Sequence, residues 1–140
     1  MGSVLIVDDE PAVRAVLERI LAETGHELRT AVDAESALQA IAQSTPDVVL
    51  CDVQMPGANG LWLADRIRDC APATAIVFAT VEAAVPPHES LRNGVVAYVL
   101  KPFQPEQVLR AVQDGMRWSA AAAQKHPRSR VPGRLPAGSD

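Results

Sequence analysis

The chain has 140 residues, of which 48% are hydrophobic and 21% charged, and its formal net charge at pH 7 is -4. This length and composition are typical of one globular domain with its own core. No apolar run approaches the ~20 residues that span a bilayer, and the first residues lack the pattern of a signal peptide, so we expect a cytoplasmic protein without a membrane partner. Because the part before Ser119 is acidic overall, the composition also argues against direct binding to nucleic acid.

Short apolar runs alternate with helical patterns along the chain. The apolar runs, each typical of a strand, cover residues 4–7, 27–31, 48–52, 75–79 and 95–100. Helical patterns follow at Pro11, where Pro suits a first turn, at Asp33, behind Gly60, and from Pro105. Another, shorter helix is expected between Pro86-Pro87 and Asn93-Gly94, because the Pro pair blocks helix before it.

This alternation predicts a single doubly wound (βα)5 domain of the α/β class, with a five-stranded parallel sheet and helices on both faces. We expect the domain to cover residues 1–118. Residues 119–140 are rich in Ala at first and then in Pro, Gly, Arg and Ser, a composition that cannot bury a core. They are therefore expected to form a disordered tail or the start of an interdomain linker.

Polar side chains stand where four of the apolar runs end. Asp8 and Asp9 follow the first run, Asp52 ends the third, Thr80 follows the fourth and Lys101 follows the fifth. A single Asp at such a position would more simply cap a turn or a helix. Since parallel strands share one carboxyl edge, where such sheets bind their ligands, all five groups should meet at one site.

Three carboxylates at one site repel one another, so the site should bind a cation. Hard oxygen ligands with room for water favour Mg²⁺, which commonly binds carboxylates together with a phosphate. The ammonium group of Lys101 and the hydroxyl of Thr80 both suit phosphoryl oxygens. The pattern therefore predicts a phosphoryl-transfer site in which Asp52 is the nucleophile.

These residues resemble those of a known family, the receiver domain of bacterial two-component response regulators. The resemblance runs from Val4 to Trp118 and rests on the residues above together with Met55-Pro56-Gly57, Asn59-Gly60, Tyr98 and Lys101-Pro102. It implies the flavodoxin-like strand order 2-1-3-4-5. It also implies a phosphorelay switch that accepts a phosphoryl group from a sensor histidine kinase and controls an output domain or downstream protein. Such a phosphoprotein is not an enzyme beyond its own phosphorylation and dephosphorylation.

The resemblance also implies individual roles. Asp52 would be the phosphoacceptor and a metal ligand, Asp9 would bind Mg²⁺ directly, and Asp8 would do so through water. The backbone carbonyl of Gln54 would complete the protein ligands, and Lys101 would pair with the phosphoryl group.

A second set of implied roles concerns the conformational change. Thr80 would move toward the phosphoryl oxygen and Tyr98 would turn inward, although Tyr98 could also be a half-buried strand aromatic with its hydroxyl in water. The Lys101-Pro102 bond would be cis.

Some positions depart from the family pattern. Val81 is bulkier than the small residue usual there, and we expect it to slow both phosphorylation by small donors and hydrolysis. The resemblance implies that Glu82 and Gln54 are the neighbours that influence water attack on the acyl phosphate. Pro86-Pro87 makes the short helix expected before Asn93-Gly94 unusual for the family. A homodimer formed through that helix is therefore in doubt.

Three other functions compete with this interpretation. An FMN carrier shares the fold, but its first loop cradles a phosphate that Asp8-Asp9-Glu10 would repel. A phosphatase with an aspartyl nucleophile would need a second acid where Gln54 stands. A constitutive, phosphorylation-independent scaffold that only binds other proteins is the remaining alternative.

Overall fold

The structure, a computed structural model, describes residues 2–55, 57–81 and 94–125. Five parallel strands form one sheet in the order β2-β1-β3-β4-β5, which confirms the predicted fold and strand order. The strands are β1 (Ser3–Val7), β2 (Glu27–Ala31), β3 (Val48–Cys51), β4 (Ala75–Thr80) and β5 (Val95–Leu100). The helices are α1 (Pro11–Leu21), which ends in a short 3-10 turn, η1 (Ala22–Thr24), then α2 (Ala34–Gln43), α3 (Gly60–Cys70) and α4 (Pro105–Lys125).

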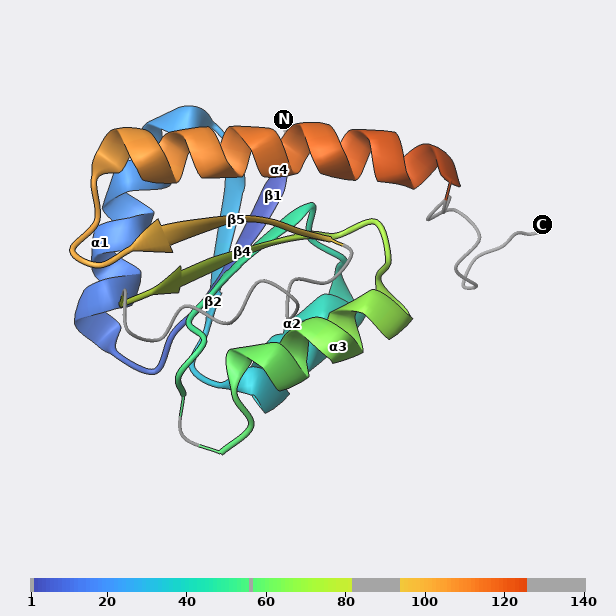
Figure 1. The fold of residues 1–140 in the computed structure, drawn as a ribbon, viewed down its shortest axis with the longest axis horizontal. Helices are drawn as coiled ribbons and strands as arrows, with labels where there is room; N and C mark the ends of the chain where they lie inside the picture. Colours follow the sequence, from blue (N-terminus) through green and yellow to red (C-terminus); the bar gives the residue numbers. More distant parts are fainter. Residues whose placement is uncertain (1, 56, 82–93, 126–140) are drawn as a thin grey trace.

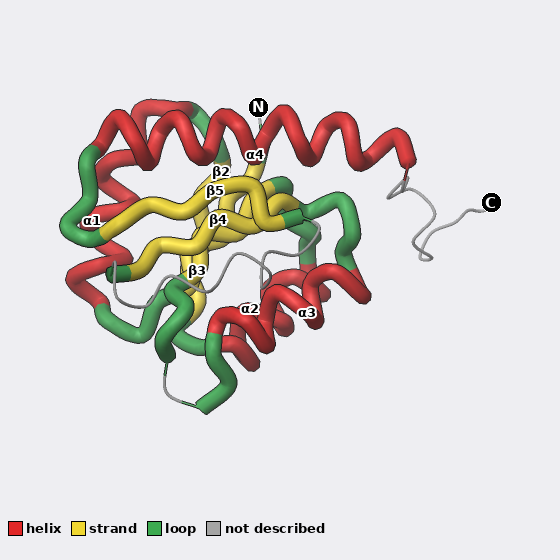
Figure 2. Tube along the Cα trace, viewed as in Figure 1, coloured by secondary structure: helices red, strands yellow, loops and turns green. Residues whose placement is uncertain are grey.

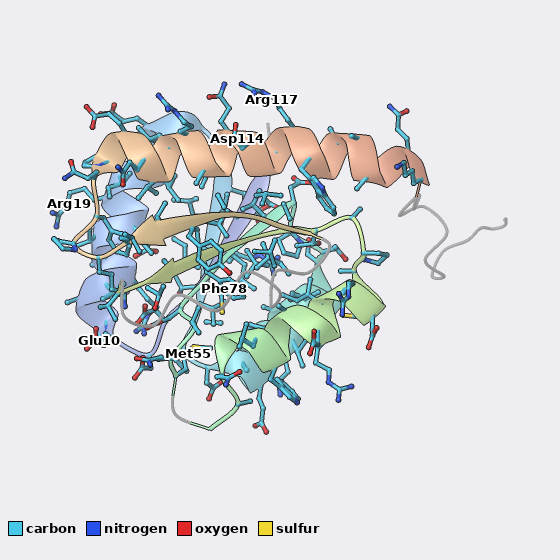
Figure 3. All side chains as sticks on the ribbon, viewed as in Figure 1. Glu10, Arg19, Met55, Phe78, Asp114 and Arg117 are labelled. Atoms are coloured by element: carbon cyan, nitrogen blue, oxygen red, sulfur yellow. The ribbon has the colours of Figure 1, made fainter. Side chains whose placement is uncertain are left out.

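Helices cover both faces of the sheet (Figure 1). One core cluster joins α2 and α3 to one face of the sheet, and the other joins α1 and α4 to the opposite face. Figure 2 shows the strands in yellow between these two layers of red helices. Phe78, labelled in Figure 3, belongs to the cluster on the α3 side. The helix expected between Pro86-Pro87 and Asn93-Gly94 lies outside the described residues.

Local sequence signals explain where the helices begin. Pro11 occupies the first turn of α1, as its fixed φ favours. The Asp33 side chain accepts the backbone N–H of Ser36, whose own side chain accepts the N–H of Asp33, so α2 starts with a capping box. In α3, the Asn59 side chain accepts the N–H of Trp62 at 2.9 Å. Each cap satisfies an N–H group that the helix itself leaves without a partner.

The parallel register aligns the ends of the central strands. Val7 pairs with Cys51 of β3, and Cys51 pairs with Phe78 of β4. All residues of β3 and β4 are buried, because helices pack on both faces. Since Asp8 directly follows Val7 and Asp52 directly follows Cys51, the register places these two side chains next to each other at the carboxyl edge.

Helix α4 continues beyond Trp118, where we expected the domain to end, and reaches Lys125. Ser119 and Ala122 are buried, and the Ser119 hydroxyl donates to the carbonyl oxygen of Ala73 at 2.6 Å. The last two turns of the helix therefore pack on the connection between α3 and β4. Within the described ranges, neither α4 nor any shorter helix is long and apolar enough to cross a membrane.

Candidate functional site

Three carboxylates meet at the carboxyl edge of the sheet. Oxygen atoms of Asp8, Asp9 and Asp52 all lie within 4.8 Å of one another. Asp8 and Asp52 are buried, with exposed fractions of 1% and 7%, whereas Asp9 is exposed. The predicted convergence of these three residues is therefore present, and one side of the cluster is open to solvent.

Lys101 reaches the same cluster from the connection that follows β5. Its Nζ lies 3.0 Å from Oδ2 of Asp52 and 3.3 Å from Oδ2 of Asp8. Its backbone N–H donates to the carbonyl oxygen of Thr80 at 2.9 Å, and the Lys101-Pro102 bond is cis, as the resemblance implied. The structure thus brings together the four charged groups that we predicted at this edge.

Burial and charge act against each other at Asp8. Burial raises the pKa of the Asp8 carboxyl, and the hydrogen bond from Glu10 and the charge of Lys101 offset only part of that rise. For Lys101, burial alone would lower the pKa of the ammonium group. The hydrogen bond to Asp52 and the charges of both carboxylates outweigh burial, so the pKa of Lys101 is raised.

Each buried carboxylate is oriented by the backbone that follows it. Oδ1 of Asp8 accepts the N–H of Glu10 at 3.0 Å, and Oδ1 of Asp52 accepts the N–H of Gln54 at 3.0 Å. The Oδ2 atom of each carboxylate is thereby directed toward Lys101. Both carboxylates thus form Asx turns, so the turn-capping role that we considered as the simpler alternative for such an Asp is present together with the shared site.

Gly60 is close to the backbone of Asp52, a position that its place in the Asn59-Gly60 motif did not predict. A Cβ atom on Gly60 would lie 2.4 Å from the backbone carbonyl oxygen of Asp52 and 2.9 Å from Cα of Val53. The N–H of Gly60 donates to the Val53 carbonyl at 2.9 Å. The first turn of α3 can therefore approach the Asp52 backbone this closely only because residue 60 has no side chain.

The hydroxyl of Tyr98 is buried on the neighbouring strand. The Tyr98 ring lies 5.5 Å from the Phe78 ring, measured between centroids. In the part of the chain that the structure describes, the Tyr98 hydroxyl has no hydrogen-bond partner, and burial raises its pKa. Tyr98 is therefore not a strand aromatic with its hydroxyl in water, which was the alternative we considered.

Three of the four remaining predicted residues lie in the described part of the chain. Thr80 is buried at the end of β4, while the next residue, Val81, is 44% exposed. The Gln54 side chain is exposed. Glu82 lies outside the described residues, so its role stays a prediction.

The donor set of the cluster fits a hard divalent cation. Among the described residues, the candidate metal ligands of the cluster are all carboxylate oxygens, and the thiol of Cys51 donates to the Asp52 carbonyl oxygen at 3.2 Å. Burial strongly raises the pKa of Cys51, so this group stays a neutral thiol and not a thiolate ligand. Buried carboxylates with one exposed neighbour match the way Mg²⁺ binds through a few carboxylates while it keeps several waters.

Comparisons with known proteins agree with this geometry. A model of the response regulator receiver domain family matches residues 4–113. The chain is 34% identical to the DNA-binding transcriptional regulator NtrC of Escherichia coli over 132 residues, 91% of this chain and 27% of that protein. It is 36% identical to the regulatory protein AtoC of Escherichia coli over 121 residues, 84% of this chain and 26% of that protein. The chain thus spans about a quarter of the length of these curated relatives.

Solved structures show the same relationship. The receiver domain of NtrX from Brucella abortus aligns with a TM-score of 0.75 and 31% identity, covering 82% of this chain and 98% of that domain. A putative response regulator from Chloroflexus aurantiacus aligns with a TM-score of 0.73 and 32% identity, covering 83% and 98%. The matched family model, these alignments and the acidic cluster beside Lys101 agree: the chain belongs to the response regulator receiver domains of two-component signalling.

Proposed function

We propose that this receiver domain accepts a phosphoryl group on Asp52. The observation that carries the proposal is the position of Lys101, whose ammonium group lies between Asp52 and Asp8 at the open acidic cluster. A cation at that point can pair with the oxygens of an incoming phosphoryl group, whose negative charge the carboxylates alone would repel.

The acidic cluster is the proposed Mg²⁺ site. Asp9 and Asp52 would supply carboxylate oxygens, Asp8 would bind through water, and Gln54 would supply its backbone carbonyl. When bound, Mg²⁺ supplies positive charge that offsets the charge of the carboxylates and of the phosphoryl oxygens. The all-oxygen donor set and the exposed position of Asp9 support this assignment.

The residues of the chain perform the transfer as follows. A carboxylate oxygen of Asp52 attacks the phosphorus of a phosphohistidine, an O–P bond forms, and the P–N bond of the donor breaks. The electron pair of the broken bond stays on the departing imidazole nitrogen, which takes a proton from solvent where its protonation state requires it. The hydrogen bond from Gln54 N–H to Oδ1 fixes the orientation of the nucleophile throughout.

Thr80 and Tyr98 are the proposed conformational switch. Movement of the Thr80 hydroxyl toward the phosphoryl oxygens would leave space beside β5 that the Tyr98 side chain could fill. The buried Tyr98 hydroxyl has no hydrogen-bond partner in the described part of the chain, so its rearrangement breaks no such bond there. A small energy difference between the two arrangements is what a ligand or a modification can bias.

A sensor histidine kinase is the proposed phosphodonor, and an output domain or a downstream protein is the proposed recipient of the signal. The names of the NtrC relatives assign DNA binding to much longer proteins. With a net charge of -4, this chain is itself better suited to contacts with proteins than with DNA. We propose no turnover chemistry for it other than its own phosphorylation and dephosphorylation.

The test is intact-mass measurement after incubation with MgCl₂ and acetyl phosphate. The wild-type chain should gain one phosphoryl group, and the gain should disappear when EDTA replaces MgCl₂. Asp52→Asn should gain none, whereas Asp33→Asn, which removes an exposed carboxylate from a helix cap, should be modified like the wild type.

A mass gain that persists in Asp52→Asn would refute the assignment of the phosphoacceptor. If the wild type gained nothing, and beryllofluoride with MgCl₂ also failed to bind, the constitutive scaffold would be the better interpretation.

A further inference from the structure

Arg14, in the second turn of α1, holds the loop that carries two of the three carboxylates. Its guanidinium Nη1 donates to the carbonyl oxygen of Asp8 at 2.7 Å. Its backbone N–H donates to the carbonyl oxygen of Glu10 at 3.2 Å. The side chain is partly buried, so these bonds are shielded from competing water on one side. The backbone bond is the ordinary bond of the first helical turn, so the side-chain bond to the Asp8 carbonyl is the one that requires arginine.

The Asp8 carbonyl belongs to the peptide group that joins Asp8 to Asp9. The Asp8 N–H is fixed on its other side by the Ala31 carbonyl at 3.2 Å, and the Asp8 side chain by Glu10. Across residues 2–55, 57–81 and 94–125, no backbone N–H donates to the Asp8 carbonyl, so the guanidinium is its partner there. Rotation of this peptide plane would change where the next side chain, Asp9, points.

We propose that Arg14 is a positioning residue for the cation site. By fixing the Asp8-Asp9 peptide plane, the guanidinium holds the Asp9 carboxylate within reach of Asp8 and Asp52. This inference rests on the proposed function, because it assumes that the cluster binds Mg²⁺. It assigns to Arg14 no contact with the metal or with the phosphoryl group.

The sign of the effect separates positioning from simple electrostatics. Arg14 carries a positive charge near the cluster, and that charge alone opposes the binding of a cation. If charge were all that mattered, removal of the guanidinium would tighten Mg²⁺ binding. If Arg14 positions the loop, removal must weaken it, as happens when the partners behind metal ligands are lost.

The experiment measures Mg²⁺ affinity directly on Arg14→Met. The control is Arg19→Met, which removes an exposed cation from the last turn of the same helix. Glu10 and Arg19, labelled in Figure 3, mark the two ends of α1. The dissociation constant is read from amide chemical shifts in ¹H–¹⁵N spectra during titration with MgCl₂. Those shifts report on the folded molecules, so partial unfolding of a variant does not distort the constant.

We expect Arg14→Met to raise the dissociation constant roughly tenfold, the lower end of what loss of an outer-sphere partner costs. Arg19→Met should leave it within about twofold, since an exposed charge farther along the helix is screened. The Glu10 amide should also exchange with solvent faster in Arg14→Met, because its acceptor, the Asp8 carboxylate, is no longer held in place. Arg14→Gln, which is too short to reach the carbonyl, should behave like Arg14→Met.

The outcomes distinguish the two proposals. If the wild type binds Mg²⁺ and Arg14→Met binds it equally or more tightly, the positioning role is refuted while the proposed function stands. If Arg14→Met and Arg19→Met weaken Mg²⁺ binding equally, the effect is one of general charge or stability, and the positioning role is again refuted. If the wild type does not bind Mg²⁺, both proposals fail.

Discussion

At the amino edge of the sheet, buried polar side chains bond to backbone carbonyls. Thr74 Oγ1 donates to the Pro46 carbonyl at 2.7 Å, and Ser119 Oγ donates to the Ala73 carbonyl at 2.6 Å. At the carboxyl edge, the buried polar groups include two carboxylates that share one ammonium group, that of Lys101. The two buried hydroxyls at the amino edge are therefore satisfied, and the half-buried Asp47 carboxylate there accepts the N–H of Ser3, whereas the carboxyl edge keeps two buried carboxylates whose charge a ligand can relieve.

This difference shows where the fold gives up stability for function. A buried hydroxyl with a carbonyl acceptor contributes a modest net stabilisation. A second buried carboxylate near the first is unfavourable until a cation joins it. The following variants test whether the two edges differ in this way.

The largest expected effect is the loss of stability in Gly60→Ala at the carboxyl edge, compared with the same addition of a methyl group in Gly115→Ala at the amino edge. Gly60→Ala would place Cβ 2.4 Å from the Asp52 carbonyl oxygen, a backbone atom, and should destabilise the fold by about 3 kcal/mol or more. Gly115→Ala meets a Val48 methyl at 2.9 Å, which can move, and gains helix propensity, so its cost should stay below roughly 1.5 kcal/mol. Urea denaturation measures the free energy of unfolding of both variants. Equal losses of stability would contradict the proposed difference between the two edges.

The next effect concerns the amino edge alone. Ser119→Ala leaves the Ala73 carbonyl without its buried donor and should cost about 2 kcal/mol. Gln113→Ala, an exposed change on the same helix, should cost less than about 0.5 kcal/mol. Neither change should alter Mg²⁺ affinity in a calorimetric titration. A loss of affinity in Ser119→Ala would show that the two edges are coupled.

At the carboxyl edge, Asp8→Asn should raise the stability of the protein where Ser119→Ala lowers it. We expect a stabilisation of the metal-free protein by roughly 1 kcal/mol at pH 7. Because burial raises the pKa of Asp8, its ionised form is disfavoured in the folded state. The penalty is absent below the unfolded pKa of about 3.9 and is complete above the folded pKa. The advantage of the variant should therefore grow as the pH rises through this interval.

Thermal unfolding with and without MgCl₂ measures this effect. Mg²⁺ at ten times its dissociation constant should stabilise the wild type by about 1.4 kcal/mol. It should stabilise Asp8→Asn much less. If Asp8→Asn proved less stable than the wild type at pH 7 without metal, the ion pair with Lys101 would outweigh the cost of burial.

The smallest effect is kinetic. Val81 directly follows Thr80, the last residue of β4, and is exposed, and we predict that it slows phosphorylation by acetyl phosphate and hydrolysis of the phosphorylated form. Val81→Ala should raise both rates a fewfold, on the order of 0.5–1 kcal/mol in activation free energy. Mass spectrometry over time measures both rates. Unchanged rates in the variant would refute the prediction.

The strand-end residues could be predicted because their position depends on topology alone. In a parallel sheet, whatever follows Val7 and Cys51 must lie at the carboxyl edge. The roles of Gly60 and Arg14 depend instead on how closely a helix approaches a loop, and no periodicity in the sequence reports that distance. The extent of α4 was missed for a related reason: its buried face past Trp118 consists of Ser119 and Ala122, which are too small or polar to show as an apolar stripe.

The order in which this chain is synthesised differs from the order in which its core can close. Val4 and Val48 are buried in one cluster with Val108 and Val112 of α4, which are synthesised after them. Until α4 has left the ribosome, that face of β1 and β3 has α1 but lacks α4 as a cover. A nascent chain that stops before residue 105 therefore leaves the strand residues of this cluster without their α4 partners, and should bind chaperones or aggregate more readily than a chain that includes α4.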